Sequence, residues 1–449
     1  MSAGGGDVAI VGGGVLGLTL GLRLAQRGHQ VTVLEAESQV GGLATADAIG
    51  HIRWDRFYHV ILGADTRLLA LLSEIGLGHT LAWARTRTGF YVDGAWHSMS
   101  SALDFLRFPP LSLVEKARLG LTILAASRIS DGRRLEGITA IDWLTQWSGR
   151  RTVDVMWRPL LRSKLGPNTE IASAAFIWAI IARMYGARQS GGKLESMGYV
   201  RGGYDSILPA LRSHATRAGV CIVTDARVAG VQSHGGTATI AFHDGSSREF
   251  GNVVMTVPCG RVAALCSDLT PDEKARLERV VYQGVVCPSF LLRRPLKGYY
   301  VTNITAAGIP FTGVIETTAL VDPAEVGGHT LVYLPRYLSQ SDAMWQRSDD
   351  DIADEFFAAL RGMLPDLTPN DVVARRVARA KEVLAVSTLR YSTDLMPPLR
   401  TSQRRLFVAN SAQIAQGTLN VDETVALANR SAAALDGLLL RRAVVATHA

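Results

Sequence analysis

The chain has 449 residues, 47% hydrophobic and 19% charged, so it is long and apolar enough for two or three folded domains and is not a disordered protein. Its formal charge of +7 comes without a run of like charges, which argues against a nucleic-acid partner and leaves anionic substrates, a lipid surface or an arginine-rich proteome as explanations. The four cysteines lack CxxC spacing and no apolar run is long enough to span a membrane, so we expect a cytoplasmic protein without disulfides or a metal site.

A nucleotide-binding βαβ pattern opens the chain. The apolar run at 8–11 predicts a buried strand, and the glycines after it allow a tight turn, a close approach of backbone amides to a diphosphate, and close helix packing. A second strand at 31–34 ends at an acid about 20 residues past the glycines, where a carboxylate binds ribose hydroxyls and repels a 2′-phosphate. We therefore predict a Rossmann-like α/β fold that binds an adenosine dinucleotide through Gly12, Gly14, Val15, Leu16, Gly17, Glu35 and Ala36.

A second pair of glycines, Gly41 and Gly42, follows the acid. Together with the GxGxxG before it, this pair resembles the opening of the FAD-dependent amine oxidase superfamily, which includes protoporphyrinogen oxidases, phytoene desaturases and UDP-galactopyranose mutases. The resemblance implies FAD, with the glycine pair again close to the diphosphate. Many members place Arg or Lys directly after the pair, whereas this chain has Leu43, so we expect a charged cofactor contact to be missing there.

The segment 51–62, HIRWDRFYHVIL, crowds aromatic, cationic and acidic side chains into a short apolar stretch. In the resembling superfamily the segment after the glycine pair passes the isoalloxazine ring, which implies a place for His59 near flavin N5. His59 is therefore the candidate catalytic residue, since histidine serves as a general acid or base. The alternative is a hydrogen-bonded histidine that orders a turn, because the sequence shows no partner for it.

The next stretch reads first as a helix at 68–75 capped by Asp65, then as a hairpin at 85–98. Residues 103–185 predict an inserted, largely helical substrate or cap region. At 103–124 apolar and basic residues mix as in an interfacial helix, so peripheral contact with the inner face of a membrane is one interpretation. A buried helical hairpin over a substrate pocket explains the mixture equally well.

The second half of the chain shows features of the superfamily in the superfamily's order. Strands near 220–231 return to the first domain, where the resemblance implies that Val228 lays its backbone against adenine. Short strands between 285 and 337 predict an antiparallel sheet beside the flavin. Its polar and aromatic side chains predict a substrate pocket lined by Tyr299, Asn303, Glu316, Tyr333 and Arg336.

A strand at 405–411 and a helix that begins near Asn420 close the fold. Asn420 and Glu423 have the spacing of an N-cap and capping box. In the resembling superfamily the strand ends in an acid that contacts the ribityl chain, and Ser411 stands in that place here. The positive end of the helix would stabilise a reduced flavin. Further cofactor contacts are expected from Ser411, Thr418, Asn420 and Val421, and the FAD is expected to be non-covalent because 401–430 contains no Cys or His.

These segments predict a Rossmann-like FAD-binding domain in three parts, a helical insertion and a mixed antiparallel-sheet substrate domain. The FAD-binding parts are 1–84, 191–275 and 381–449, the inserted region is 85–190, and the substrate domain is 276–380.

The leading function is an FAD-dependent oxidase, dehydrogenase or desaturase that takes a hydride from a small organic molecule, apolar or lipid-linked substrates included. The main alternative is a non-redox isomerase of the UDP-galactopyranose mutase type, with Arg183, Arg336 and Arg390 available to clamp a diphosphate. An NAD-binding protein without flavin and a non-catalytic flavin scaffold are two further alternatives. The sequence leaves the substrate, the electron acceptor and the oligomeric state open.

Overall fold

The computed structural model describes residues 6–191, 196–234, 236–415 and 420–446. A five-stranded parallel sheet in the order β10–β2–β1–β14–β21 organises one side of the molecule. Its strands are β1 (Asp7–Val11), β2 (Gln30–Leu34), β10 (Cys221–Val223), β14 (Asn252–Met255) and β21 (Leu406–Val408). Because they come from the beginning, middle and end of the chain, the predicted Rossmann-like fold assembled from discontinuous segments is confirmed.

Alternate residues of β1 enter two different cores, one on each face of this sheet. Val8 and Ile10 pack with the helices on one face, which are α1 (Val15–Ala25), α2 (Thr66–Glu74), α9 (Tyr204–Arg217) and α14 (Val421–Ala446). Ala9 and Val11 pack on the other face under β11 (Val228–His234), β12 (Thr237–Phe242), β13 (Ser247–Phe250), α10 (Cys259–Leu265) and α11 (Pro271–Glu278). Burial on both faces explains the unbroken apolar run at 8–11.

A larger sheet of eight strands forms the other side. It contains β15 (Tyr282–Leu292), β16 (Val301–Ile304), β17 (Gly313–Glu316), β18 (Thr330–Tyr333), β19 (Arg336–Leu338) and β20 (Val372–Ala385), with α12 (Asp349–Met363) packed on it. The predicted hairpin is present as β7 (Thr88–Val92) and β8 (Ala95–Ser98), and β7 pairs in parallel with β16. The sheet therefore takes two strands from the region predicted to be a largely helical insertion.

Two small sheets join the halves. They are β3 (Ala46–Ile49) with β4 (Ile52–Asp55), and β5 (Ile61–Leu62) with β9 (Ser196–Val200) and β6 (Leu81–Arg85).

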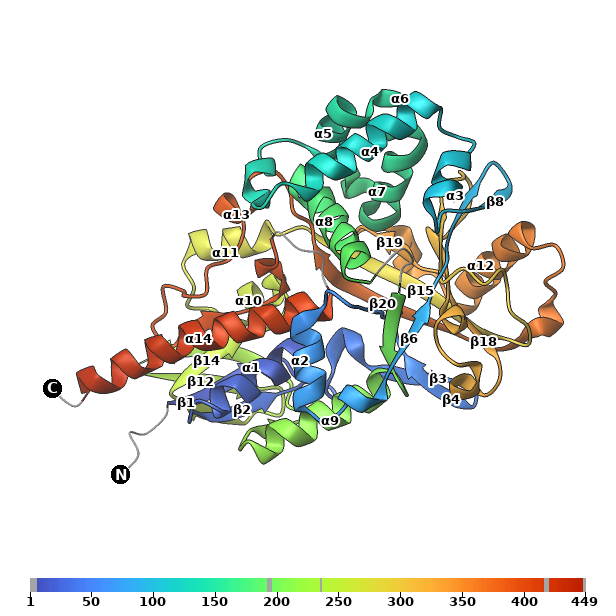
Figure 1. The fold of residues 1–449 in the computed structure, drawn as a ribbon. Helices are drawn as coiled ribbons and strands as arrows, with labels where there is room; N and C mark the ends of the chain where they lie inside the picture. Colours follow the sequence, from blue (N-terminus) through green and yellow to red (C-terminus); the bar gives the residue numbers. More distant parts are fainter. Residues whose placement is uncertain (1–5, 192–195, 235, 416–419, 447–449) are drawn as a thin grey trace.

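A helical cap covers the junction of the two halves and lies at the top of Figure 1. Its helices are α3 (Ala102–Arg107), α4 (Leu113–Ser127), α5 (Ala140–Ser148), α6 (Arg150–Thr152), α7 (Arg158–Leu165) and α8 (Ala174–Gly191), and the short α13 (Tyr391–Asp394) lies near the chain's end. Phe90 and Val92 of β7 belong to the same apolar core as the cap helices. The cap is thus fixed to the larger sheet by apolar side chains of β7 that pack among the cap helices.

The start of α2 is held by a residue that the sequence did not indicate. Asp65 precedes the helix as predicted, but its carboxylate makes no cap bond and instead accepts the Leu62 amide (2.9 Å) and an ion pair from Arg183 (3.0 Å). Asp422, in the first turn of α14, accepts the backbone amides of Arg67 (2.8 Å) and Leu68 (2.9 Å). One buried carboxylate therefore ties the N-terminal ends of α2 and α14 together.

Replacing Asp422 with alanine should lower the free energy of unfolding by about 1–3 kcal/mol, because two amides at the start of α2 lose their acceptor. Urea denaturation of the wild type and the variant measures this difference. Asp366→Ala, at an exposed acid for which the described residues provide no ion pair, is the control, and it should change the value by less than about 0.5 kcal/mol. Equal effects of the two substitutions would show that the amide contacts of Asp422 contribute nothing.

Candidate active site

The turn between β1 and α1 contains two kinds of glycine. A Cβ on Gly17 would lie 1.9 Å from the Gly12 carbonyl oxygen, so the packing of α1 on β1 itself requires a glycine there. A Cβ on Gly14 would meet nothing closer than the Gly41 carbonyl oxygen at 3.9 Å. The space beside Gly14 is therefore open, and it lies at the N-terminal end of α1, where backbone amides favour an anion.

The second glycine pair lies directly against this turn. The Gly41 amide donates to the Gly13 carbonyl (2.9 Å), and Gly14 and Gly41 form an isolated parallel bridge. Gly41 has φ +130° and its α-carbon faces Leu208 of α9, where a Cβ would come within 2.4 Å of the Leu208 side chain. The two glycine motifs, separate in sequence, thus form one backbone cradle, with Leu43 in the turn that follows Gly42.

Glu35 links this cradle to the region expected to hold adenosine. Its carboxylate accepts the amides of Gly13 (2.8 Å) and Glu37 (3.0 Å), while its carbonyl accepts the Ala226 amide (2.8 Å). Ala226 leads into β11, which begins at Val228. The acid and the strand predicted to contact ribose and adenine therefore lie side by side at the end of β2, and Ala36 lies beside them.

The C-terminal segment reaches the same edge of the parallel sheet. Ser411 begins a short turn after β21, and the Asn420 side chain accepts the Glu423 amide (2.9 Å) at the start of α14, so the predicted N-cap is present. Val421 is the first residue of that helix. Thr418 lies outside the described residues.

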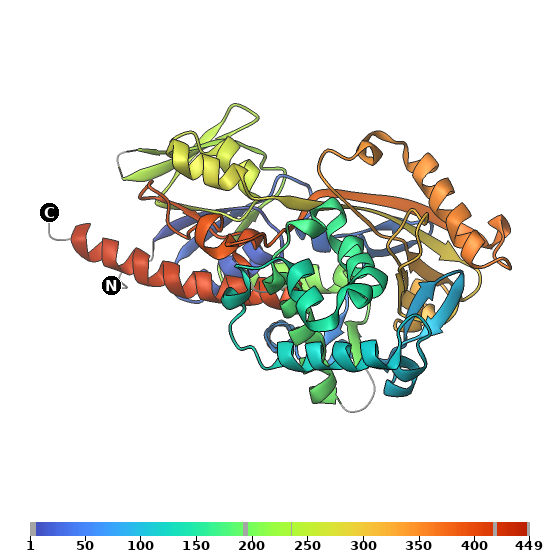
Figure 2. The same ribbon diagram turned by 90° about the horizontal axis from the view of Figure 1, so that it is seen from above.

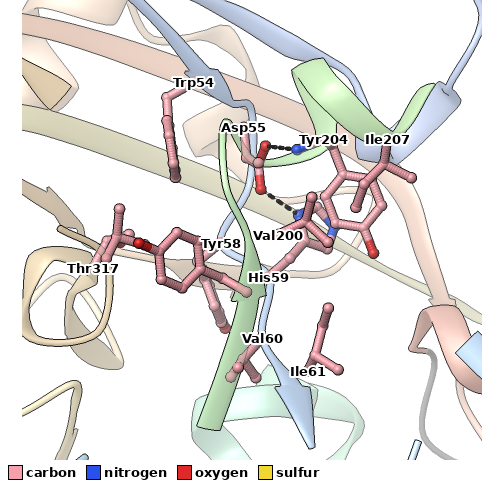
Figure 3. Close-up of a pocket in the computed structure, with 14 residues that line it drawn as sticks. Trp54, Asp55, Tyr58, His59, Val60, Ile61, Val200, Tyr204, Ile207 and Thr317 are labelled. Atoms are coloured by element: carbon pink, nitrogen blue, oxygen red, sulfur yellow. Dashed lines mark hydrogen bonds and ion pairs between the residues drawn. The ribbon is translucent and has the colours of Figure 1, made fainter. Parts of the chain in front are cut away.

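His59 lies in a pocket formed by the end of β4, the β4–β5 loop, β9, the start of α9 and the turn at 317–321 (Figure 3). Its Nδ1 lies 3.4 Å from Oδ2 of Asp55, a close contact that does not meet the geometry of a hydrogen bond. The imidazole packs against the Tyr204 ring, with 4.5 Å between centroids. Asp55 is 5% exposed and also accepts the Tyr204 backbone amide (2.7 Å), so Asp55 lies between His59 and α9.

Helix α9 connects this pocket with the glycine cradle. Tyr204 and Leu208 lie one turn apart on the helix, and Leu208 contacts Gly41 while Tyr204 contacts His59. A second hollow, lined in part by Val40, Thr45, Tyr204 and Leu208, lies between the glycine pair and α9. His59 is therefore placed one helical turn away from the backbone that cradles the predicted diphosphate.

The backbone that presents Asp55 is fixed from the larger sheet. The guanidinium of Arg376 in β20 donates to the carbonyls of Asp47 (3.0 Å) and Asp55 (2.8 Å), and the Tyr333 hydroxyl donates to the Asp55 carbonyl (2.5 Å). Burial raises the pKa of the Tyr333 phenol well above its ordinary range, so the hydroxyl stays a donor. Asp55 and His59 are thus held between the two halves of the molecule.

A cation reaches the other side of the β4–β5 loop from the cap. Lys164 of α7 donates to the Tyr58 hydroxyl (2.9 Å), and the hydroxyls of Tyr58 and Tyr337 are 3.0 Å apart. Burial, with a further contribution from Tyr337, raises the pKa of Tyr58 well above its usual value, so the Tyr58 phenol stays protonated beside Lys164. Tyr58 also lines the His59 pocket, and the cap therefore touches the site directly.

Comparison with protein-family models gives one decisive match. The model described as flavin containing amine oxidoreductase matches residues 17–435. The chain belongs to this family.

Individual relatives of this chain are distant in sequence and close in fold. A Mycobacterium tuberculosis protein named as a flavin-containing monoamine oxidase is 24% identical over 296 residues, which are 62% of this chain and 63% of that protein. A structure named as a protoporphyrinogen oxidase of Exiguobacterium sp. 255-15 is 17% identical, with a TM-score of 0.75 over 96% of this chain and 98% of its own. A reduced UDP-galactopyranose mutase is 14% identical, with a TM-score of 0.74 over 96% of both chains. The TM-scores show a shared fold at these low identities, and the sequence match spans about 63% of the length of the curated relative.

The cofactor of this member of the family is FAD. Membership of the family gives the flavin, and the residues present fit the dinucleotide. A Cβ on Gly14 would have the Gly41 carbonyl oxygen, at 3.9 Å, as its nearest neighbour, so the protein leaves room for a diphosphate there. The carboxylate of Glu35 lies at the end of β2, where a ribose is bound in Rossmann-like folds. The FAD that the sequence predicts is therefore confirmed.

The five predicted substrate-pocket residues are spread over the larger sheet, and none lines the pocket around His59. Tyr299 stacks on Trp96, with Arg87 over its ring. Asn303 lies within β16, and the Glu316 carboxylate accepts hydrogen bonds from three backbone amides at 296–298. Arg336 donates to the Pro310 carbonyl (3.2 Å). Tyr333 alone among the five touches the site, through the Asp55 carbonyl, and a substrate role for these residues stays a prediction.

The sequence did not identify Asp55, Tyr204 or Lys164 as residues of the site. Asp55 was visible in the crowded segment 51–62, but its partner Tyr204 lies 149 residues further along the chain. The signal that was available is the pair Gly202 and Gly203, which turn the chain at φ +78° and +62° directly before Tyr204. A Cβ on Gly203 would lie 2.7 Å from the Asp55 carboxylate, so this glycine permits the contact.

Proposed function

We propose that this protein is an FAD-dependent oxidoreductase that takes a hydride from a small organic substrate. The observation that carries the proposal is the place of the Asp55 and His59 pair, in a pocket one turn of α9 away from the glycine cradle. Bound FAD would supply the hydride acceptor. Membership of the flavin-containing amine oxidoreductase family supports the same class of reaction.

The residues around the pocket would position a substrate and handle a proton. Asp55 faces Nδ1 of His59, which favours the tautomer with hydrogen on that nitrogen and leaves Nε2 as the basic atom. The assignment of the tautomer rests on this contact. Tyr204 holds the plane of the imidazole by packing against it, and Trp54 contributes an apolar wall. We infer that His59 accepts the proton that a substrate N–H or C–H releases as the hydride leaves.

An isomerase of the mutase type needs cations that converge on a substrate diphosphate. The three arginines considered for that role are each engaged elsewhere: Arg183 with Asp65 (3.0 Å), Arg336 with the Pro310 carbonyl (3.2 Å) and Arg390 with Asp394 (3.1 Å). Their partners lie in different elements. This arrangement favours the redox function over the isomerase.

The finer proposal is an apolar or lipid-linked substrate, with the protein in peripheral contact with a membrane. Its support is the exposed apolar surface of the cap, together with the contact of cap residue Lys164 with Tyr58 of the pocket.

A true substrate should bleach the oxidised flavin absorption in one anaerobic turnover, and oxygen or another acceptor should restore it. Stopped-flow absorbance with a panel of amines and apolar alcohol or alkene substrates measures this. A mutase would behave in the opposite way, because it would need prior reduction and would leave the net redox state unchanged over many turnovers. Turnover of a UDP-sugar only by chemically reduced protein would therefore overturn the proposal.

A further inference from the structure

The outer surface of the cap is apolar. Ten large apolar side chains are exposed among the described residues, and seven of them lie between 103 and 147, on three neighbouring helices. We call this group the cap face, and it consists of Leu103, Leu106, Leu113, Val114, Leu121, Leu124 and Trp147. Isolated exposed leucines need no explanation, but a cluster of this kind marks an interaction surface.

Helix α4 is apolar on two opposite sides. Leu119, Thr122 and Ala126 are buried and pack toward the cap interior, which accounts for one side. Leu113 and Val114 are 72% and 71% exposed, and Leu121, which lies two turns after Val114, is 59% exposed. Figure 2 shows α4, in teal, along the outer edge of the cap. Packing within the chain therefore explains the inner side of α4 and leaves the outer side unused.

Arginines border the cap face. Arg107 ends α3 directly after Leu106, and Arg128 follows Leu124 by one turn and Leu121 by two. Arg107, Arg128 and Arg150 are exposed and form no ion pair with a described residue. Residues 101–151 contain eight Lys or Arg against five Asp or Glu.

Two of the five acids in this stretch are paired with arginine, whereas Asp104 and Asp142 accept hydrogen bonds from serine or threonine hydroxyls and form no ion pair with a described residue. Glu115 pairs with Arg151 (2.6 Å) and caps α4, which holds the pKa of its carboxyl at about 2, and Asp131 pairs with Arg133 (2.8 Å). The region of the cap face therefore carries a net positive charge.

We propose that the cap face docks on an anionic lipid surface, with the leucines in the boundary of the acyl chains and the arginines among the headgroups. Leucine, tryptophan and arginine in this arrangement have the composition of an interfacial helix. Among the described residues no helix has the length and apolar character needed to cross a bilayer, so the contact is peripheral. The inference deepens the proposed function and rests on it in one respect: α7 of the same cap contacts Tyr58 of the His59 pocket, so the cap that would dock on lipid is also part of the wall around the proposed active site.

Sedimentation with vesicles tests this docking. The FAD-loaded protein is mixed with vesicles of phosphatidylcholine alone or of phosphatidylcholine and phosphatidylglycerol in equal parts, and the bound fraction is measured. The wild type should bind the anionic vesicles, and the double variant Leu113→Gln/Leu121→Gln should bind at least about tenfold more weakly, because two apolar side chains that would enter the acyl-chain boundary are lost. Arg107→Gln/Arg128→Gln should remove most of the preference for phosphatidylglycerol.

Leu389→Gln is the matched control, since Leu389 is 43% exposed outside the cap face. It should bind like the wild type. No binding by the wild type, or equal binding by the Leu113→Gln/Leu121→Gln variant, would overturn the proposal. A wild-type dimer in gel filtration that this variant dissociates would also overturn it, since the cap face would then be an interface between copies. FAD content and dye-coupled turnover are measured on the same samples, so loss of vesicle binding with normal turnover separates this proposal from the proposed function.

Discussion

Gly14→Val should give a folded protein that no longer retains FAD. The structure separates these two properties at this position, because Gly14 has an ordinary φ of −66° and a Cβ would have no protein atom within 3.9 Å. A branched side chain would instead fill the space in which backbone amides and a diphosphate approach each other. The wild type should purify yellow and release its FAD into the supernatant on acid precipitation, and the variant should be colourless with an unchanged circular dichroism spectrum.

A comparison of two glycines sharpens this experiment. Gly17→Ala places a Cβ 1.9 Å from a backbone oxygen of Gly12, so it should destabilise the protein whether or not cofactor is present. Gly14→Val should leave the unfolding midpoint of the cofactor-free protein close to that of cofactor-free wild type. A Gly14→Val protein that keeps FAD with near-normal affinity would mean that the diphosphate is bound elsewhere.

The cofactor domain was predictable because its rules are local. Glycines at fixed spacing, buried strands and a terminal acid each impose a conformation on their own neighbourhood, and the structure places Gly12, Gly14, Gly17 and Glu35 as these rules require. The order of the segments also made it possible to predict that the FAD-binding domain is assembled from separate parts of the chain. In the structure each of these short apolar strands has a parallel partner in the same sheet.

The site around His59 was less accessible to such reasoning because its contacts are long-range. The helix cap expected from Asp65 is supplied by Asp422, 354 residues further on than Leu68, whose amide it accepts. Glu316 is a polar residue of the kind that lines substrate pockets, but its carboxylate accepts backbone amides of the turn at 296–298. A polar side chain in a sheet can face a ligand or satisfy a backbone donor, and the sequence does not distinguish these outcomes.

The exposed side of α4 illustrates the same limit. The mixed sequence at 103–124 fitted both a buried hairpin and an interfacial helix. The structure shows that α4 has one buried side and a second that is exposed, so the helix is packed on one side only, and membrane contact of the exposed side stays a proposal. Periodicity in the sequence reports the apolar positions but not which neighbours cover them.

His59→Ala should slow flavin reduction by substrate by about 10²-fold or more, if His59 accepts the proton released with the hydride. The imidazole contacts Asp55 and Tyr204 and no residue of the glycine cradle, so FAD content should be unchanged. Asp55→Asn removes the charge that faces Nδ1 while keeping the shape, and should produce a smaller slowing in the same step. Anaerobic stopped-flow at saturating substrate measures the reduction rate directly and separates it from substrate binding.

Rescue by added imidazole distinguishes proton transfer from packing. The His59→Ala variant leaves room beside Tyr204, so free imidazole should restore part of the reduction rate in a concentration-dependent way if a base is what was lost. A merely structural histidine would give no rescue, because a freely diffusing imidazole does not replace packing contacts. Arg376 and Tyr333 hold the backbone of Asp55 independently of His59, so that backbone should be unchanged in the variant. An unchanged reduction rate in His59→Ala would return His59 to the role of a core histidine, and the assignment of FAD to the glycine cradle would be unaffected.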